Sequence, residues 1–274
     1  MRCFLCRDSR FAFVSNIQGR QIVKCKKDGL ILSVVKAKPH KSPYGRTYYH
    51  VPAHSSLFDS YWPYFKQKLA VIRSKTRIKM PHVLDIGCGW GEFLEVLRRH
   101  RINYLGIDTS NRSISICKKK GLNARRKQIQ NLKTGKKRYD AISMFQVIEH
   151  IENPLPVLRA ALKLLKKGGI LLITTPNHES PIRKILKQNW SVYHDPTHVA
   201  FYDKKTLKTV LKKAGFRKSE VKNDAWRFIS LSHVIRRLHV MFPSIINLPP
   251  WLVIRLSIPI PTDPWGDLMA VARK

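Results

Sequence analysis

The chain has few acidic residues and no long uninterrupted apolar run. Its 17 Asp and Glu residues stand against 52 Lys and Arg, which gives a formal net charge of +35. Such a charge favours polyanionic partners, namely nucleic acid, anionic lipid head groups or acidic glycans. The alternative is that the source organism uses lysine frequently in all of its proteins. Because no run could span a bilayer and the start lacks a signal-peptide core, we expect a cytoplasmic protein. Peripheral contact at the inner face of the membrane stays open.

Cysteine is also scarce, and five cysteines in a cytoplasmic chain are not expected to form a disulfide scaffold. Three of them, Cys3, Cys6 and Cys25, lie near the start, and Asp28 occupies the fourth position of a pattern that is nearly a zinc ribbon. Three thiolates and one carboxylate can bind zinc, although this ligand set is uncommon. Both a zinc-bound and a metal-free ribbon are therefore open for residues 1–35.

A glycine-containing turn between a strand and a helix is the most informative stretch. The apolar strand ends at Asp85, and Gly87, Gly89 and Gly91 follow at alternate positions before a helical pattern resumes. Glycines can adopt positive φ and allow a ligand to approach the backbone. A phosphate-binding loop would need Lys and then Ser or Thr after the last glycine, and a dinucleotide fingerprint has a different spacing. A carboxylate at the strand tip suits a cationic ligand better than a pyrophosphate.

From residue 81 onward strands and helices alternate, which predicts an α/β fold with a parallel sheet covered on both faces. Asp108 ends the second strand about twenty residues after the glycine turn, where a carboxylate can accept both hydroxyls of a ribose. It could also cap a helix from Ser110 onward, and both roles are compatible, with ribose binding preferred. The apolar run 170–175 is expected at the sheet centre, and 267–273 as the last strand.

The letters D-I-G-C-G-W-G at 85–91 resemble the first motif of class I S-adenosylmethionine-dependent methyltransferases. Residues 139–150 resemble the fourth motif of the ubiquinone-biosynthesis O-methyltransferases within that class. The resemblance covers roughly 81–221 and the last strand. It implies a Rossmann-like, doubly wound, mostly parallel seven-stranded sheet with helices on both faces, and S-adenosyl-L-methionine as cofactor. The residues expected at that cofactor are Asp85, Gly87, Cys88, Gly89, Gly91, Asp108, Thr109, Gln128, Phe145 and Gln146.

Two positions depart from that family's pattern. Gln128 or Gln130 stands where an acidic residue usually receives the adenine amino group, and a glutamine carbonyl can still accept that hydrogen bond. Gln146 replaces the first glutamate of the E-x-x-E-H divalent-metal motif, so we predict no metal there. The first 35 residues resemble the small N-terminal ribbon that precedes some methyltransferases of bacterial glycan and secondary metabolism.

A segment of aromatic and titratable residues at 190–202 should overhang the cleft and face the methyl acceptor. A neutral imidazole can remove the acceptor's proton at pH 7, and His194 or His198 is preferred over His150 by a narrow margin. An aromatic stripe along the helix at 58–72 either packs on the core or forms a lid.

These observations predict four regions: a ribbon-like segment at 1–35, a linker and aromatic helix at 36–80, a methyltransferase core at 81–225, and an apolar basic insertion with the terminal strand at 226–274. The insertion either packs on the core or contacts an anionic bilayer. We expect methyl transfer to an oxygen or nitrogen of a small molecule or saccharide, including a lipid-linked one. The alternatives are an RNA methyltransferase, which the charge favours, and a non-catalytic nucleoside-binding module.

Overall fold

The computed structural model describes residues 1–35, 55–132, 139–224, 227–230, 259–262 and 266–274. The predicted linker at 36–54 and most of the predicted apolar insertion lie outside these residues. No helix in the described ranges is long and apolar enough to cross a membrane.

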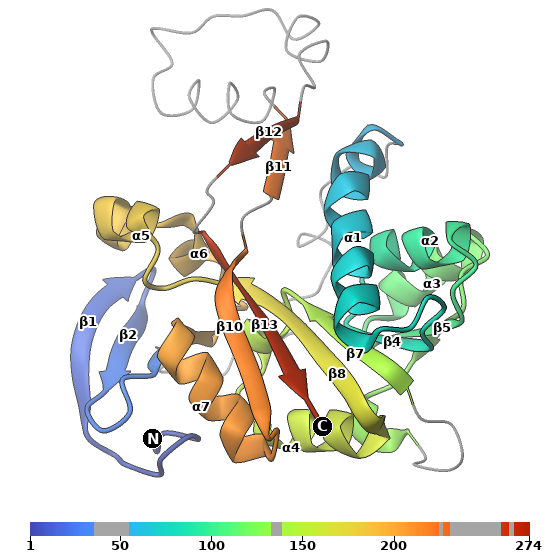
Figure 1. Cartoon of the computed structure of the whole chain (residues 1–274). Helices are drawn as coiled ribbons and strands as arrows, with labels where there is room; N and C mark the ends of the chain where they lie inside the picture. The colour runs from blue at the N-terminus through green and yellow to red at the C-terminus, as the bar shows by residue number, and fades with distance from the viewer. Residues whose placement is uncertain (36–54, 133–138, 225–226, 231–258, 263–265) are drawn as a thin grey trace, which may run out of the picture.

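A seven-stranded sheet forms the centre of the molecule, with the order β10-β13-β8-β7-β4-β5-β6 (Figure 1). Strand β13 runs antiparallel to both of its neighbours, and the other adjacent pairs are parallel. This confirms the predicted mostly parallel sheet. The strands are β4 (Val83–Ile86), β5 (Tyr104–Asp108), β6 (Ala124–Arg126), β7 (Tyr139–Phe145), β8 (Leu165–Pro176), β10 (Lys218–Asp224) and β13 (Asp267–Arg273).

The order of these strands places a crevice beside β4. The chain goes from β4 to β5 and β6 on one side, and then returns to β7 and β8 on the other side. In open parallel sheets, ligands bind beyond the carboxyl ends of the strands at such a reversal. The fold therefore points to the loops after β4, β5 and β7.

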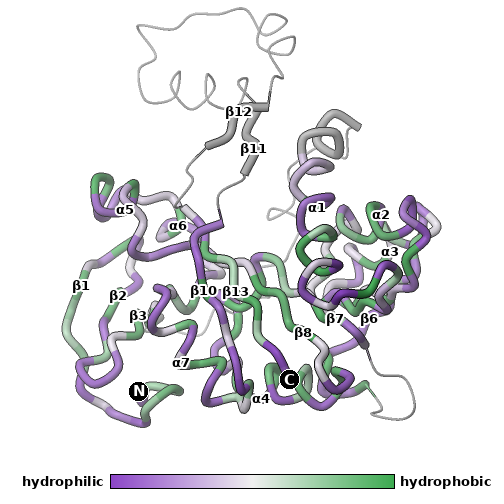
Figure 2. The backbone as a smooth tube through the Cα atoms, in the orientation of Figure 1, coloured by the Kyte–Doolittle hydropathy of each residue, from purple (hydrophilic) through white to green (hydrophobic). Residues whose placement is uncertain are grey.

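Helices cover both faces of the sheet. Because successive strand residues point to opposite faces, Leu172 belongs to the hydrophobic cluster that contains Leu94, while Leu171 belongs to the one that contains Leu158 and Leu207. Figure 2 shows the hydrophobic centre beside the largely hydrophilic edge strand β10. The first layer contains α1 (Ser55–Thr76), α2 (Glu92–Arg99) and α3 (Asn111–Lys119), and the second contains α4 (Leu155–Leu164) and α7 (Lys204–Ala214).

Helix α1 is fixed to the sheet by a buried ion pair. The ammonium group of Lys68 bonds the Asp224 carboxylate at the end of β10, and the Tyr64 hydroxyl donates to the same carboxylate at 3.2 Å. Removing one partner of such a pair leaves an uncompensated buried charge. The pair therefore holds α1 in place, and with it the Phe65 side chain.

The N-terminal residues form a second, antiparallel sheet in the order β1-β2-β3-β9. Its last strand comes from the segment between α6 (Ser191–His194) and α7. There Leu32 pairs with Ala200, and the Ser33 N–H donates to the Val199 carbonyl at 3.0 Å. Leu5 and Leu32 join the hydrophobic cluster that also contains α4 and α7. The first 35 residues thus share a core with the central domain. The strands are β1 (Phe11–Ile17), β2 (Arg20–Cys25), β3 (Ile31–Val35) and β9 (Ala200–Phe201).

Two elements of the central domain are short. Strand β6 contains three residues, and a 3-10 turn follows it. Helix α4 ends at Leu164, so that Gly168 and Gly169 lie inside β8. The remaining elements are η1 (Ile129–Asn131), η2 (Ile148–His150), α5 (Pro181–Leu186), η3 (Lys187–Asn189), α6 (Ser191–His194), β11 (Arg227–Ser230) and β12 (Pro259–Thr262).

Candidate active site

A cavity of about 530 Å³ opens at the carboxyl ends of β4, β5 and β7. It contains nine of the ten residues predicted to contact a cofactor, namely Asp85, Gly87, Cys88, Gly89, Asp108, Thr109, Gln128, Phe145 and Gln146. The tenth, Gly91, packs behind the turn, where an added Cβ would lie 2.4 Å from a methyl carbon of Leu122. The structure thus gathers the predicted set at one place, while the binding role of each residue stays a prediction.

The glycine turn leaves room for a ligand on its cavity side. Gly89 has φ of +53°, and a Cβ added there would meet nothing closer than Glu92 at 3.9 Å. Gly87 also has positive φ, at +69°, but its Cβ would lie 2.5 Å from a methyl group of Val147. Gly89 therefore keeps space open beside the cavity, and Gly87 allows the loop after β7 to approach the turn.

The Asp108 carboxylate is held at the tip of β5 by backbone groups. One oxygen accepts from the Gly89 N–H at 3.0 Å, and the other accepts from the Ser110 N–H at 2.8 Å. The helix cap belongs to Ser110, whose side chain accepts from the Ser113 N–H. Burial raises the pKa of Asp108. Asp108 is therefore an oriented acceptor on the cavity wall rather than the cap of α3.

Asp85 is more deeply buried and lies beneath the turn. The Ser143 hydroxyl donates to its carboxylate at 2.6 Å. Burial, with a smaller effect from the charge of Asp108, raises the pKa of Asp85 to about 7, although the Ser143 bond acts in the opposite direction. A carboxyl group with this pKa changes its charge near neutrality, and a cationic ligand would favour its ionised form.

Aromatic rings line one side of the cavity. Phe145 packs at 5.0 Å from Phe93 and at 5.5 Å from Phe65, measured between ring centroids. Phe65 comes from α1, so the predicted aromatic stripe contributes to the cavity as well as to the core. The side chain of Phe58, at the start of that stripe, lies outside the described residues.

The loop after β7 brings polar groups to the cavity. Gln146 has the unusual φ of +54°, and its side-chain amide donates to the Asp267 carboxylate at 3.1 Å. His150, four residues later in η2, also lines the cavity. Left-handed backbone at a non-glycine residue carries strain that often occurs at functional sites.

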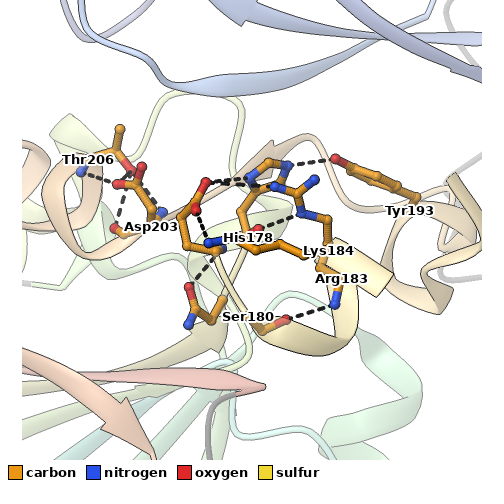
Figure 3. A network of polar contacts seen from close by, with 9 residues as sticks. His178, Ser180, Arg183, Lys184, Tyr193, Asp203 and Thr206 are labelled. Atoms are coloured by element: carbon orange, nitrogen blue, oxygen red, sulfur yellow. Dashed lines mark hydrogen bonds and ion pairs between the residues drawn. The ribbon is translucent and has the colours of Figure 1, made fainter. Parts of the chain in front are cut away.

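Several hydrogen bonds hold the segment 190–202 in place. The Tyr193 hydroxyl bonds Nε2 of His178 at 2.6 Å, and Figure 3 shows this pair within a wider network that includes Arg183. Burial, with a contribution from the charge of Arg183, lowers the pKa of His178 to about 3, so the ring is neutral and accepts the phenol proton. The guanidinium of buried Arg20 donates to the carbonyls of Tyr193 and His198. The N-terminal sheet thus helps to shape this segment.

The three histidines predicted as candidate bases lie in different surroundings. His194 is exposed, and its ring contacts the Gln188 carbonyl at 3.1 Å, away from the cavity lining. His198 is buried beside His150, with ring centroids 4.7 Å apart. Burial, reinforced by the charge of His198, lowers the pKa of His150 to about 4. His150, ranked last by sequence, is the one of the three that lines the cavity.

Glu149, His150 and His198 each place one potential ligand atom within 4.8 Å of the others. Polar contacts within the protein engage all three: the Thr175 hydroxyl donates to Glu149, Thr197 contacts His150, and the Val192 carbonyl contacts His198. We therefore interpret this group as a hydrogen-bonded network.

The cysteines near the start form a compact cluster with Asp28. Sγ of Cys3 lies 3.1 Å from the Asp28 carboxylate, and the Sγ atoms of Cys6 and Cys25 are 3.4 Å apart. All four ligand-type atoms lie within 4.8 Å of one another. Burial and the neighbouring Asp28 raise the pKa of Cys6 to about 11. The residues predicted as zinc ligands are therefore brought together, although the presence of a metal stays a prediction.

Sequence comparison identifies a family of proteins that contain this domain. A family model described as "Methyltransferase domain" matches residues 58–221. The ubiquinone biosynthesis O-methyltransferase of Coxiella burnetii is 30% identical over 116 residues, which cover 40% of this chain and 50% of the relative. The same-named enzyme of Cereibacter sphaeroides is 34% identical over 101 residues, covering 35% and 41%. The chain thus spans half or less of the length of these two curated relatives.

Solved structures share the fold at low sequence identity. A SAM-dependent methyltransferase from Archaeoglobus fulgidus is 23% identical, covers 80% of this chain and 97% of its own, and has a TM-score of 0.55. A plantazolicin methyltransferase in complex with a desmethyl analogue and SAH is 21% identical, covers 79% and 85%, and has a TM-score of 0.54. At these identities the likeness concerns the fold.

Proposed function

The chain belongs to the methyltransferase domain family, and we propose that it transfers the methyl group of S-adenosylmethionine to an oxygen or nitrogen atom of a small-molecule or saccharide acceptor. The observation that carries the proposal is the placement of the oriented Asp108 carboxylate and the open Gly89 turn on one cavity. The curated relatives that act as O-methyltransferases favour oxygen as the acceptor atom.

The residues present fit the donor by their chemistry. Asp108 offers two carboxylate oxygens for ribose hydroxyls, and Gln128 offers an amide carbonyl for the adenine amino group. The positive φ and vacant Cβ direction of Gly89 allow the backbone to approach the ligand, while Asp85 supplies negative charge for a cation. When bound, the donor would supply a methyl group that is electrophilic because it is bonded to a positively charged sulfur.

The protein's own contribution is mainly positioning. Phe65, Phe93 and Phe145 exclude water from one wall of the cavity. The glycine turn and Asp108 would fix the donor. No residue of the segment 190–202 lines the cavity, and this segment would act on the acceptor through the contact of Thr197 with His150. Alignment of two reactants at a fixed distance supplies much of the rate increase in a bimolecular displacement.

RNA is the second acceptor class that a specific observation favours, because the net charge of +35 suits a polyanion. A motif of Asn or Asp followed by two prolines, usual for methylation of base amino groups, is replaced after β7 by Gln146, Val147, Ile148 and Glu149. This difference favours a saccharide or small molecule. The cytoplasmic location and the contact of the tail with an anionic membrane surface stay predictions, and they would suit a lipid-linked acceptor.

Zinc at the N-terminal sheet is a separate part of the proposal. We propose that Cys3, Cys6, Cys25 and Asp28 bind one Zn²⁺ ion. Zinc–sulfur bonds of about 2.3 Å in a tetrahedron separate two sulfurs by about 3.8 Å, and the Cys6–Cys25 separation of 3.4 Å is close to this value. A zinc ion at this place would tie the start of the chain to the strand that carries Cys25.

A transfer assay tests the proposed reaction. Donor labelled in its methyl group is incubated with the protein and, separately, with cell-envelope saccharides, lipid-linked sugars and RNA. We expect label in a saccharide or small-molecule fraction, and a lipid-extractable product would identify the lipid-linked class. Label in RNA would favour the second acceptor class, and binding of donor without transfer to any fraction would favour a non-catalytic module.

A further inference from the structure

Thr197 links His150 to a carboxylate. Nδ1 of His150 lies 2.7 Å from the Thr197 hydroxyl oxygen, and that oxygen lies 2.6 Å from Oδ1 of Asp195. The Thr197 backbone N–H also donates to the same carboxylate oxygen, at 2.8 Å. His150 is thus connected to Asp195 through one side chain, although the two elements are far apart in the sequence.

The direction of each hydrogen bond follows from the chemistry of the groups. An ionised carboxylate only accepts, so the single hydroxyl proton of Thr197 goes to Asp195. The Thr197 oxygen must then accept from His150, which places a proton on Nδ1. The Thr197 backbone carbonyl, 3.3 Å from the same Nδ1, can also only accept. Both contacts require the Nδ1–H tautomer, in which Nε2 is the basic nitrogen.

We propose that His150 is the general base for the methyl acceptor and that Thr197 and Asp195 are positioning residues that fix its Nδ1–H tautomer. The proposal rests on the proposed methyl transfer and assigns the proton of that reaction. As the new C–O or C–N bond forms and the S–C bond of the donor breaks, the proton of the acceptor hydroxyl or amine moves to Nε2 of His150. The imidazolium then returns this proton to water.

The surrounding charges suit a ring that is neutral before the reaction and charged during it. Burial opposes ionisation of Asp195, but the charge of His198 and the Thr197 hydrogen bonds hold its pKa below the usual value. Asp195 in turn stabilises a charge on His150, whereas His198 and burial oppose it. Glu149, from the same turn as His150, is the further titratable group of this cluster. Asp195 therefore lowers the free energy of the imidazolium that proton transfer creates.

His198 is the competing base, and its contacts give it a different role. Its Nδ1 lies 2.8 Å from the Val192 carbonyl, and its Nε2 lies 3.7 Å from Asp195. The ring packs against His150 and Phe201 behind the cavity wall. These contacts place His198 as a neighbour that shifts the pKa of His150, while His150 itself lines the cavity.

Nuclear magnetic resonance of the protein labelled with ¹⁵N-histidine tests the proposal without knowledge of the acceptor. Two-bond nitrogen–proton correlations distinguish the Nδ1–H from the Nε2–H tautomer, and His150→Gln identifies the signal of His150. Thr197→Val removes the hydroxyl at nearly constant shape, and Thr197→Ser retains it. Thr209→Val, on the exposed side of α7, is the matched control.

We expect His150 in the Nδ1–H tautomer in the unmodified protein, in Thr197→Ser and in the control. In Thr197→Val the Nε2–H form should gain population, because only the longer contact with the Thr197 carbonyl, at 3.3 Å, then favours Nδ1–H. Transfer to the acceptor should fall about 10- to 100-fold with donor affinity within about twofold, since acid–base catalysis contributes about 10²–10⁴-fold. Asp195→Asn should lower the pKa of His150 further, whereas His198→Gln should raise it.

An Nε2–H tautomer in the unmodified protein would overturn the proposal, as would a His150 signal that Thr197→Val leaves unchanged. Calorimetric titration of the same variants with S-adenosylmethionine separates this outcome from a failure of the proposed function. Absence of donor binding in the unmodified protein would refute the methyl transfer. Intact donor binding with His150 in the Nε2–H tautomer would refute only the assignment of Thr197 and Asp195.

Discussion

Nδ1 of His150 and the hydroxyl oxygen of Thr197 lie 2.7 Å apart, although 47 positions separate the two residues in the chain. The first residue follows β7 of the central sheet, and the second precedes β9, which pairs with the N-terminal sheet. The two sheets therefore meet at a polar contact beside the cavity. The N-terminal sheet thus adjoins the segment that contacts His150.

The glycine turn provides a prediction with a matched control. Gly89 and Gly121 both have positive φ, at +53° and +68°, and an added Cβ meets nothing within 3.4 Å at either position. Gly89→Ala and Gly121→Ala should therefore destabilise the fold by similar amounts, about 1 kcal/mol each. Because only Gly89 lines the cavity, only its substitution should weaken donor binding, by about 10-fold or more for a methyl group in the binding space. Calorimetry with S-adenosylmethionine measures the difference, and equal affinities of the two variants would contradict the prediction.

Asp85 should reduce the stability of the ligand-free protein at neutral and alkaline pH. Its pKa is about 7 in the folded protein, against 3.8 for an unperturbed aspartate. Between these values the folded state binds more protons than the unfolded state, so stability falls as pH rises from about 4 to 7. A difference of about three pKa units corresponds to at most about 4 kcal/mol.

Asp85→Asn removes this cost while the amide oxygen can still accept from Ser143. Denaturant unfolding should show the variant to be about 2–4 kcal/mol more stable at pH 8 and little changed at pH 4. Its affinity for the cationic donor should fall. The Glu152→Gln variant, at an exposed position, controls for general charge effects. An equal change at both pH values would show that Asp85 is not responsible.

Much of the site could be predicted because its signals are local in the chain. Asp85, the three glycines and Asp108 lie within 24 consecutive residues, and strand and helix patterns fix where they meet. The general base was harder to predict from the sequence. His194, His198 and His150 have the same chemistry in the sequence, and only the tertiary contacts with Gln188, Val192 and Thr197 distinguish them.

The pairing of β9 with β3 could not be predicted for a similar reason. A strand of two residues has no detectable periodicity, and its partner lies in the first 35 residues. The sequence predicted a ribbon-like segment over 1–35, and the structure pairs this segment with residues 200–201 through Leu32 and Ala200. The D-x-[ST] pattern at Asp195 and Thr197 is a local turn signal that could have drawn attention to this place.

The cysteine cluster leads to a prediction about metal content. If Cys3, Cys6, Cys25 and Asp28 bind zinc, the purified protein should contain about one zinc ion per chain by elemental analysis. Cys25→Ser should lose the ion, and a strong chelator should lower the melting temperature, because a ligand that binds only the folded state stabilises it. Cys117→Ser, which changes a buried thiol outside the cluster, should keep the ion. A metal-free protein whose melting temperature resists the chelator would refute this site.

The most direct test of the cavity's role is calorimetric titration with S-adenosylmethionine of the unmodified protein and of Asp108→Ala. The carboxylate that accepts from Gly89 and Ser110 is predicted to hold the ribose, so the unmodified protein should bind one donor molecule per chain. The variant should bind it at least about 10-fold more weakly, since hydrogen bonds to a charged group contribute about 1.5–3 kcal/mol. Absence of binding, or binding that Asp108→Ala leaves unchanged, would contradict the assignment of this cavity to the methyl donor.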